Sequence, residues 1–320
     1  MTAALPIPVA GSVVTVGSFD GVHRGHLAVL DEISARAQAT GRVSVLVTFE
    51  PHPMEVVNPA AAPRLITTGV ERREILAQTG LDYAAILRFD AGLRAMSPET
   101  FVERVLLQRF RMRELVIGPD HGFGRERSGD VTMLREMGAR SGFTVDVVPP
   151  VRDPEVGVVS STRLRQAIVD GDLALARQLL GRPFTLSAPV VTGAQRGRAI
   201  GVPTVNLALP SRKLLPPDGV YAVRVEWAGG VAGGMLNQGP RPTVGDEERT
   251  LEAHLFGFEG SLYGSWVRLE WVTRLRDVRR FESLDALREQ LSTDAAAAKA
   301  VLDSHGPADR LGHEGRTDTD

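Results

Sequence analysis

Roughly the first 180 residues alternate short β-branched runs with segments of helical periodicity, and this alternation limits the possible folds more than any other feature. The runs VVTV (13–16) and VSVLVTF (43–49) flank a predicted helix from His23 to about Thr40, which Gly41 terminates. The apolar positions that recur on one face of this helix are Leu27, Leu30, Ile33 and Ala37. Strands and helices in strict turn predict an α/β domain with a doubly wound parallel sheet.

Polar segments follow the predicted strands. They are GSFDGVHRGH (17–26), EPHP (50–53), GPDHGFGRERSGD (118–130) and VVSSTRLR (158–165). Between them, Ser97, Pro98 and Glu99 have the residue types of an N-cap, a first helical position and a first-turn acid. Ligands of doubly wound sheets bind beyond the carboxyl ends of the strands, so we expect the four segments to meet at one binding rim.

The first polar segment has the composition of an anion site. Its glycines, Gly17, Gly21 and Gly25, let the backbone approach a ligand, and the helix that follows begins with unpaired amides and a partial positive charge. His23 and His26 stand three residues apart, so both rings lie on one face of the first turn and can donate to the same phosphates. Asp20 is suited to hold a magnesium ion or a ligand hydroxyl.

The segment after residue 158 adds donors and fixed charge. Ser160, Ser161 and Thr162 supply hydroxyls and amides at a second helix start. Arg163 and Arg165 supply the charge that a departing pyrophosphate needs. Together these residues predict adenylyl or cytidylyl transfer without a covalent intermediate.

Structural interpretations of the same residues remain open. A His-x-x-His pair is also compatible with a helix cap, or with half of a zinc site completed by His52 or Asp20. Taken alone, SSTRLR reads as an ordinary N-cap followed by solvated arginines.

Composition excludes several classes of protein. The lysines are Lys213 and Lys299, and neither follows a glycine-rich loop, which excludes a P-loop kinase and a lysyl-nucleotide ligase in the N-terminal half. The chain has no cysteine, which excludes thiolate chemistry and Cys-ligated metals. With 37 basic and 39 acidic residues, it lacks the positive field of a nucleic-acid or membrane-surface binder, so we expect a small anionic metabolite. Without a signal sequence or a long apolar run, we expect a cytoplasmic protein.

The pattern changes after Gly181. Short runs rich in valine and aromatic residues, punctuated by glycine and proline, predict a small antiparallel barrel that a helix from about Ser283 to Leu302 closes. A short helix over Gly171 to Leu180 is expected at the junction. The predicted division is a nucleotide-binding domain over 1–182, a barrel domain over 183–303 and a disordered tail over 304–320.

Three polar residues of the barrel half are candidates for chemistry. Thr204 and Asn206 alternate to the same side of an extended segment and offer oxygen ligands for magnesium. Glu252, on a predicted strand, is suited to accept a proton from an attacking alcohol. Each also has a structural interpretation, because Thr and Asn beside proline commonly end strands and a strand Glu is most often solvated.

Motifs in fixed order across both halves resemble one family. They are GSFDGVHRGH, TFEPHP, GPDHGFG and VSSTRLR, then GRAIGVPTVNL, DGVYAV, NQGPRPTVG, LEAHLFGFEGSLYG and LRDVRRFESLDAL. To about residue 303 the chain resembles the bacterial bifunctional riboflavin kinase/FAD synthetases, whose synthetase half is an FMN adenylyltransferase. The resemblance implies a Rossmann-like nucleotidyltransferase domain that adenylylates FMN to FAD and releases pyrophosphate. It also implies a β-barrel kinase domain with a C-terminal helix that phosphorylates riboflavin to FMN.

The resemblance also implies residue roles. In the synthetase half, His23 and His26 would bind the ATP phosphates and stabilise the transition state, within a nucleotide site formed by Gly17, Ser18, Phe19, Asp20, Gly21, Gly25, Ser160, Ser161, Thr162, Arg163 and Arg165. The flavin side would be formed by Asp120, Phe123 and Gly124.

In the kinase half, the resemblance assigns magnesium and ATP to Thr204 and Asn206, and the general base to Glu252. A loop covering ATP would contain Gly193, Arg196, Gly197, Arg198 and Gly201. The flavin would be contacted by Asn237, Arg241 and Arg276. Mg2+ and ATP are thus the expected cofactor and co-substrate, and riboflavin and FMN the flavin partners; the sequence makes no prediction about oligomeric state.

The chain departs from the family pattern at a few positions. His121 and Gly122 replace an aromatic and a polar residue, Gln238 replaces an isoleucine, and Val278 replaces an acid. The loss of an aromatic at 121 motivates the hypothesis that stacking on the flavin, and with it adenylylation, is weakened. Three functions remain open: the bifunctional enzyme, an enzyme with one weak half, and a flavin-binding regulator without turnover.

Overall fold

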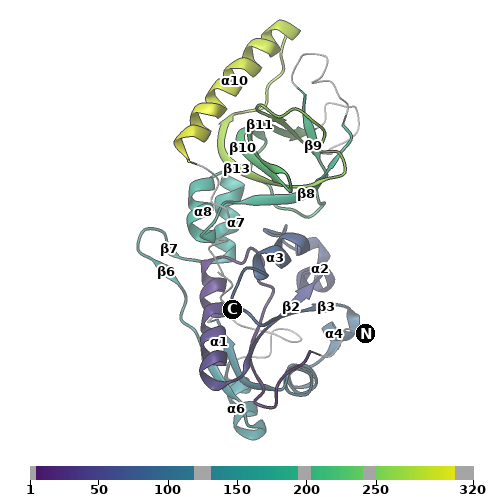
Figure 1. Ribbon diagram of the computed structural model, residues 1–320. Coiled ribbons are helices and arrows are strands. Elements are labelled where there is room, and N and C mark those ends of the chain that lie inside the picture. The colour runs from purple at the N-terminus through teal and green to yellow at the C-terminus, as the bar shows by residue number, and fades with distance from the viewer. Residues whose placement is uncertain (1–4, 119–130, 194–202, 241–248, 307–320) are drawn as a thin grey trace. The chain divides into compact units, whose positions relative to one another are not determined.

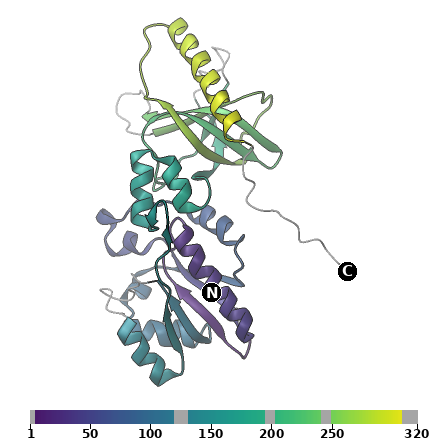
Figure 2. The same cartoon turned by 90° about the vertical axis from the view of Figure 1, so that its left-hand side faces the viewer.

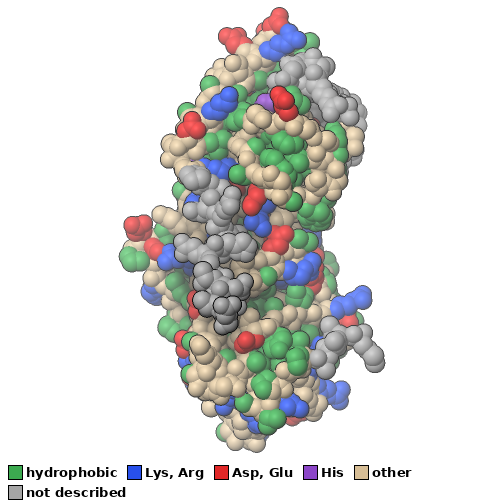
Figure 3. Space-filling model, viewed as in Figure 1, with side chains coloured by type: hydrophobic (Ala, Val, Ile, Leu, Met, Phe, Trp, Pro, Cys, Tyr) green, Lys and Arg blue, Asp and Glu red, His purple; other side chains and the backbone are tan. Residues whose placement is uncertain are grey.

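The structure is a computed structural model that describes residues 5–118, 131–193, 203–240 and 249–306. It divides into two compact units, Met1–Arg163 and Leu164–Asp320, and the division falls within one helix. Each unit has its own sheet system (Figure 1). On the face drawn in Figure 3, basic and acidic side chains are interspersed, in keeping with the near balance of 37 basic and 39 acidic residues.

The first unit contains a five-stranded sheet of the predicted doubly wound kind. Its strands are β1 Ser12–Val16, β2 Val43–Glu50, β3 Tyr83–Arg88, β4 Met112–Ile117 and β5 Thr144–Val147. Their order is β3-β2-β1-β4-β5, and every pair is parallel, which confirms the prediction. The chain starts in the middle of the sheet and winds outward in both directions, so the first loop lies at the switch point.

Helices cover both faces of this sheet. The longer ones are α1 Arg24–Thr40, α3 Gly69–Leu76, α5 Pro98–Phe101 with the π-helical segment η2 Val102–Leu107, and α6 Val131–Ser141. On one face Val13 and Leu46 pack against Ile33 of α1, and on the other Val14 packs with Phe101. The shorter elements are α2 Pro53–Val57, η1 Pro59–Ala61 and α4 Ala91–Ala95. A hairpin of β6 Arg152–Asp153 and β7 Gly157–Val158, which the sequence did not predict, precedes the second unit.

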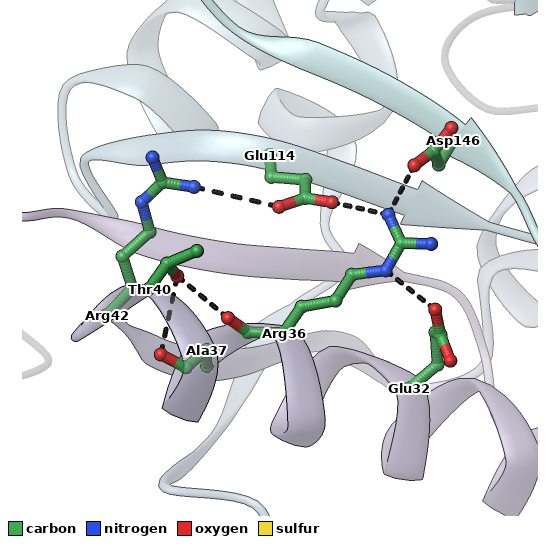
Figure 4. Close-up of polar contacts among 7 residues, drawn as sticks. All are labelled: Glu32, Arg36, Ala37, Thr40, Arg42, Glu114 and Asp146. Atoms are coloured by element: carbon green, nitrogen blue, oxygen red, sulfur yellow. Dashed lines mark hydrogen bonds and ion pairs between the residues drawn. The ribbon is translucent and has the colours of Figure 1, made fainter.

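Helix α1 follows the prediction closely. His23 is its N-cap, and Gly41 ends it in the left-handed conformation (φ 63°). Near its C-terminal end, Arg36 donates to Glu32, to Glu114 of β4 and to Asp146 of β5 (Figure 4). One guanidinium therefore ties α1 to the two strands on one side of the sheet.

The second unit is a closed antiparallel barrel preceded by two helices, as predicted. The helices are α7 Ser161–Asp170 and α8 Leu173–Leu180. The strands are β8 Thr185–Val191, β9 Val205–Leu207, β10 Gly219–Trp227, β11 Gly230–Pro240, β12 Arg249–Leu255 and β13 Trp266–Arg276, closing in the order β10-β11-β12-β9-β8-β13.

A C-terminal helix, α10 Leu284–Ser304, lies along the barrel (Figure 2). Ala298 of α10 packs against Ala222 of β10 and Met235 of β11. Side chains alternate along a strand, so the neighbouring Tyr221 and Leu236, both fully buried, point to the barrel interior. Residues in step with Ala222 and Met235 therefore belong to the outer face.

Candidate active sites in the two units

Three aromatic rings stack in the loop that follows β1. The centroids of the His23 and His26 rings are 3.7 Å apart, and those of His26 and Phe19 are 4.5 Å apart. Phe19 (φ 48°) and Val22 (φ 37°) both adopt the left-handed conformation, which non-glycine residues rarely occupy. Such strain persists only where the surroundings enforce it, and it is concentrated at functional sites.

His23 has a structural role that fixes its chemistry. Its Nδ1 atom accepts the main-chain N–H of His26 at 3.2 Å, so the imidazole caps α1, as one interpretation of the sequence allowed. Because Nδ1 is an acceptor, a neutral ring carries its proton on Nε2. The second ring nitrogen of His23 is then a hydrogen-bond donor beside the positive end of a helix, a combination suited to anions.

The predicted serine segment lies against this loop. The hydroxyl of Ser161 donates to the carbonyl of Asp20 at 3.2 Å. A Cβ atom at Gly25 would lie 3.1 Å from the His23 ring and 3.5 Å from the Val159 carbonyl, so only glycine fits comfortably between them. The structure thus brings together two motifs that are more than a hundred residues apart in sequence. Thr162, Arg163 and Arg165 follow on α7.

Asp20 holds the loop rather than projecting from it. Its side chain is buried and accepts the N–H groups of Ile66 (3.1 Å) and Thr67 (2.9 Å), while the Thr67 hydroxyl both contacts Asp20 and accepts the N–H of Gly21 at 2.9 Å. Sequence reasoning missed Thr67, because a threonine ahead of a helix resembles an ordinary cap.

Arg72 of α3 is a second residue that the sequence analysis missed. Its guanidinium donates to the carbonyls of Ser18 at 2.9 Å and Phe49 at 2.8 Å. These two carbonyls lie just beyond β1 and near the end of β2, so Arg72 links the carboxyl ends of neighbouring strands. No motif signal marked it, because an arginine on a short helix is usually solvated.

The unpredicted hairpin is attached to the start of α1. Arg24 Nη1 lies 2.5 Å from Asp153 Oδ2, and Asp153 also accepts the N–H groups of Glu155 and Val156. The hydrogen bond from Arg24, followed by those from Val156 and Glu155, lowers the pKa of Asp153 to about 2.

The kinase candidates of the barrel fall into one row. Glu252 of β12 stands directly opposite Asn206 of β9 on one side and Asn237 of β11 on the other. Asn237 in turn faces Val220 of β10, which faces Arg276 of β13. Directly opposed side chains share one face of a sheet, and Asn237 is in step with Met235, so the row lies on the outer face of the barrel.

Glycine at position 193 makes room for the predicted metal ligand. A Cβ atom there would lie 2.2 to 2.5 Å from the carboxamide of Asn206. The oxygen atoms of Thr204 and Asn206 are the hard donors that Mg2+ prefers, so the chemistry of these two side chains fits the ion. Among the described residues, no group of three or more His, Cys, Asp and Glu side chains is placed to hold a metal.

Arg276 is engaged by α10. Its Nε and Nη2 atoms donate to both carboxylate oxygens of Asp294 at 2.6 to 3.1 Å, and Nη1 donates to the Asp277 carbonyl at 2.8 Å. A bidentate pair with a buried carboxylate fixes the arginine at the end of the row.

Gln238, one of the departures from the family pattern, is fully buried inside the barrel. Its amide accepts from Trp271 at 3.1 Å and donates to the carbonyls of Pro216 and Pro217. The amide therefore satisfies its polar atoms and fastens the segment before β10, next to Asn237 in the row.

Several predicted site residues lie outside the described residues. They are Asp120, Phe123 and Gly124, Arg196, Gly197, Arg198 and Gly201, and Arg241, together with the departures His121 and Gly122. Within the residues that the structure does describe, no helix is long and apolar enough to cross a membrane.

Two family models match the chain, one in each half. The FAD synthetase model matches residues 8–163 and the riboflavin kinase model matches residues 180–302. The first match contains the His23 loop and the second contains the Asn206–Glu252 row.

Relatives of known name cover nearly the whole chain. Proteins named bifunctional riboflavin kinase/FMN adenylyltransferase are 38% identical in Escherichia coli K12 (94% of this chain, 96% of the relative) and 33% identical in Bacillus subtilis 168 (90% and 92%). A crystal structure from Streptococcus pneumoniae, described as a macrolide-efflux protein, is 33% identical with a TM-score of 0.80, over 91% of this chain and 95% of that one.

Proposed function

The chain belongs to the family of bifunctional riboflavin kinase/FMN adenylyltransferases, and we propose that each unit holds one of its two active sites. The enzyme phosphorylates riboflavin to FMN and adenylylates FMN to FAD, with ATP as the co-substrate of both reactions. One observation carries the assignment of sites: the stacked histidines and the Asn206–Glu252 row lie in different units, each inside its own family match.

We assign adenylyl transfer to the loop after β1. An oxygen of the FMN phosphate attacks the α-phosphorus of ATP, the bond from that phosphorus to the oxygen bridging to the β-phosphate breaks, and pyrophosphate leaves with the electron pair. Negative charge grows on the phosphate oxygens, and donors already aimed at them stabilise it. His23 supplies its Nε2–H, His26 a second imidazole, and the start of α1 its amides. The proposed pyrophosphate donors are Ser160, Ser161, Thr162, Arg163 and Arg165.

We assign phosphoryl transfer to the outer row of the barrel. Glu252 takes the proton of the ribityl 5'-hydroxyl as that oxygen attacks the γ-phosphorus of ATP, and ADP leaves. Asn206 lies across from Glu252 on the neighbouring strand, so the base and the phosphate-holding side are adjacent. Asn237 and Arg276 extend the row toward the flavin.

Magnesium belongs to this proposal. Thr204 and Asn206 would hold the ion, which neutralises phosphate charge when bound. Gly193 leaves the Asn206 carboxamide its present place, and the loop over Arg196, Gly197, Arg198 and Gly201 would cover ATP.

The proposed domain limits are 1–182 and 183–303, with α7 and α8 ahead of the barrel domain. We also propose flavin contacts for four residues outside the described part of the chain, namely Asp120, Phe123, Gly124 and Arg241. Because both reactions consume ATP, we propose the cytoplasm as the compartment.

Separation of the two activities tests the proposal. His26→Ala is expected to abolish FAD formation from FMN and to leave FMN formation from riboflavin intact. Glu252→Ala is expected to do the reverse when FMN is supplied. Equal loss of both activities in either variant would contradict separate sites.

A further inference from the structure

Arg72 is a buried charge with main-chain acceptors. Arg72 is 6% exposed, and its guanidinium donates hydrogen bonds to the carbonyls of Ser18 and Phe49. Among the described residues it forms no ion pair. Burial lowers the pKa of Arg72, and the charges of the Glu50 and Asp20 carboxylates oppose this effect. A buried guanidinium is costly, so its position at the strand ends calls for a local explanation.

The contacts of Arg72 lie beside the strained part of the loop. Phe19, with its φ of 48°, stands between Ser18 and Asp20. The Ser18 carbonyl accepts from Arg72 at 2.9 Å and from the Thr48 hydroxyl at 3.1 Å, and the Asp20 carboxylate accepts from the main chain of Ile66 and Thr67. The segment from Ile66 to Arg72 thus fastens both neighbours of Phe19, which is the kind of restraint that a left-handed non-glycine residue requires.

We propose that Arg72 is a positioning residue for adenylyl transfer. It holds the loop so that the Phe19 ring stays against His26, which in turn stacks on His23. Without the guanidinium, the Ser18 carbonyl loses a charged donor, Phe19 relaxes from its strained conformation, and the two imidazoles lose their common orientation. Arg72 acts through Ser18 and Phe49 and needs no contact with ATP.

This inference rests on the proposed function of the first unit, and the chain carries its own control. Riboflavin phosphorylation takes place in the other unit, so its rate reports the amount of active protein in each preparation. Arg73 is a matched control on the same helix, because it is half exposed and pairs with Glu50 at 2.9 Å.

The experiment compares Arg72→Ala, Arg72→Lys and Arg73→Ala in the full chain. The kcat and KM of FAD formation from FMN and ATP are measured with and without low concentrations of guanidinium chloride, beside the riboflavin kinase rate. We expect Arg72→Ala to lower kcat for FAD formation roughly 100-fold, the scale of a small misplacement of catalytic groups. We expect the KM for ATP and the riboflavin kinase rate of Arg72→Ala to stay near those of the wild type. For Arg73→Ala we expect kcat, KM and the kinase rate all to stay near the wild-type values.

Guanidinium distinguishes positioning from general stability. The ion can occupy the space left by the arginine side chain and restore both carbonyl contacts, so it should raise the FAD-forming rate of Arg72→Ala. If Arg72 served stability alone, the same denaturant would lower that rate further. Arg72→Lys keeps the positive charge but lacks the two-pronged guanidinium that reaches both carbonyls. We expect its rate of FAD formation to lie between those of the wild type and Arg72→Ala, which preserves the test if the alanine variant folds poorly.

Three results would overturn the inference. The first is an Arg72→Ala variant that forms FAD as fast as Arg73→Ala, and the second is an Arg72→Ala variant whose KM for ATP rises while its kcat is unchanged. The third is that guanidinium lowers the rate at which Arg72→Ala forms FAD. The second result would show that Arg72 contacts the nucleotide directly. A wild-type chain that phosphorylates riboflavin but forms no FAD would instead refute the proposed function of the first unit, and this inference with it.

Discussion

The imidazole of His23 stacks on that of His26 at 3.7 Å and at the same time accepts the main-chain N–H of His26. One side chain therefore caps a helix and presents an N–H donor at the positive end of that helix. The two roles are chemically separable, because an N-cap needs only an acceptor whereas phosphate binding needs the second ring nitrogen.

His23→Asn is expected to keep the cap and lose the phosphate donor. Asparagine is among the best N-cap residues, so the melting temperature should stay near that of the wild type while FAD formation collapses. His23→Ala should lose FAD formation and, in addition, about 1 kcal/mol of unfolding free energy. Urea unfolding and FMN adenylylation assays check both. An asparagine variant that forms FAD at the wild-type rate would show that His23 is only a cap.

Gly193→Ala is expected to impair the kinase through Asn206. The added Cβ would lie 2.2 Å from the carboxamide of Asn206, which must then leave its present position on the strand opposite Glu252. Riboflavin phosphorylation should fall roughly 10- to 100-fold while FMN adenylylation is unchanged. In the Asn206→Ala background, Gly193→Ala should not lower the rate of riboflavin phosphorylation further, because the carboxamide that it displaces is absent. Additive losses in this double-mutant cycle would refute the coupling.

Asp153 is expected to make stability depend on pH in the acid range. Its pKa is about 2 in the folded chain and 3.8 as an unperturbed group. The folded state thus favours the charged form, and the resulting stability is fully present above pH 3.8 and is lost as the pH falls through about 2. Unfolding free energies measured across this range should fall less steeply for Asp153→Asn than for the wild type. Equal slopes would mean that the Arg24 contact does not persist in solution.

Arg36→Met is expected to weaken the attachment of α1 to the sheet. Three carboxylates lose their shared donor, and Glu114, which is mostly buried, keeps Arg42 at 3.6 Å as its one ion-pair partner in the described part of the chain (Figure 4). Allowing for solvent screening, we expect a loss of about 1 to 2 kcal/mol in unfolding free energy. Residue 36 lies about 15 Å along the helix from His26, so both enzymatic rates should persist at low temperature. Chemical denaturation measures the loss, and a variant as stable as the wild type would show that the cluster contributes nothing.

The local features of the fold could be predicted from the sequence. Helix α1 has the predicted apolar face and the predicted Gly41 end, and Ser97 caps α5 as its residue type indicates. The helix predicted from about Ser283 to Leu302 is α10, which spans Leu284–Ser304. Alternation of strands and helices predicted the parallel sheet, because the short connections leave few other ways to bury both faces.

The site was only partly predictable. The histidine pair lies within one helical turn, where spacing determines geometry. The row of Asn206, Glu252 and Asn237 depends on strand register, which the loops between the strands set and residue spacing does not reveal. Thr67 and Arg72 were missed for a related reason: their polar groups bond to main-chain atoms that only tertiary packing brings near.

The most direct test of the account is a time course with purified protein, riboflavin, ATP and magnesium, in which FMN, FAD and pyrophosphate are followed by chromatography. We predict that FMN appears first and then declines as FAD and pyrophosphate rise in equal amounts. FMN that accumulates without FAD would contradict an active first site and would support the hypothesis that His121 and Gly122 weaken adenylylation. Tight flavin binding with no turnover would contradict both proposed active sites and would favour a flavin-binding regulatory protein.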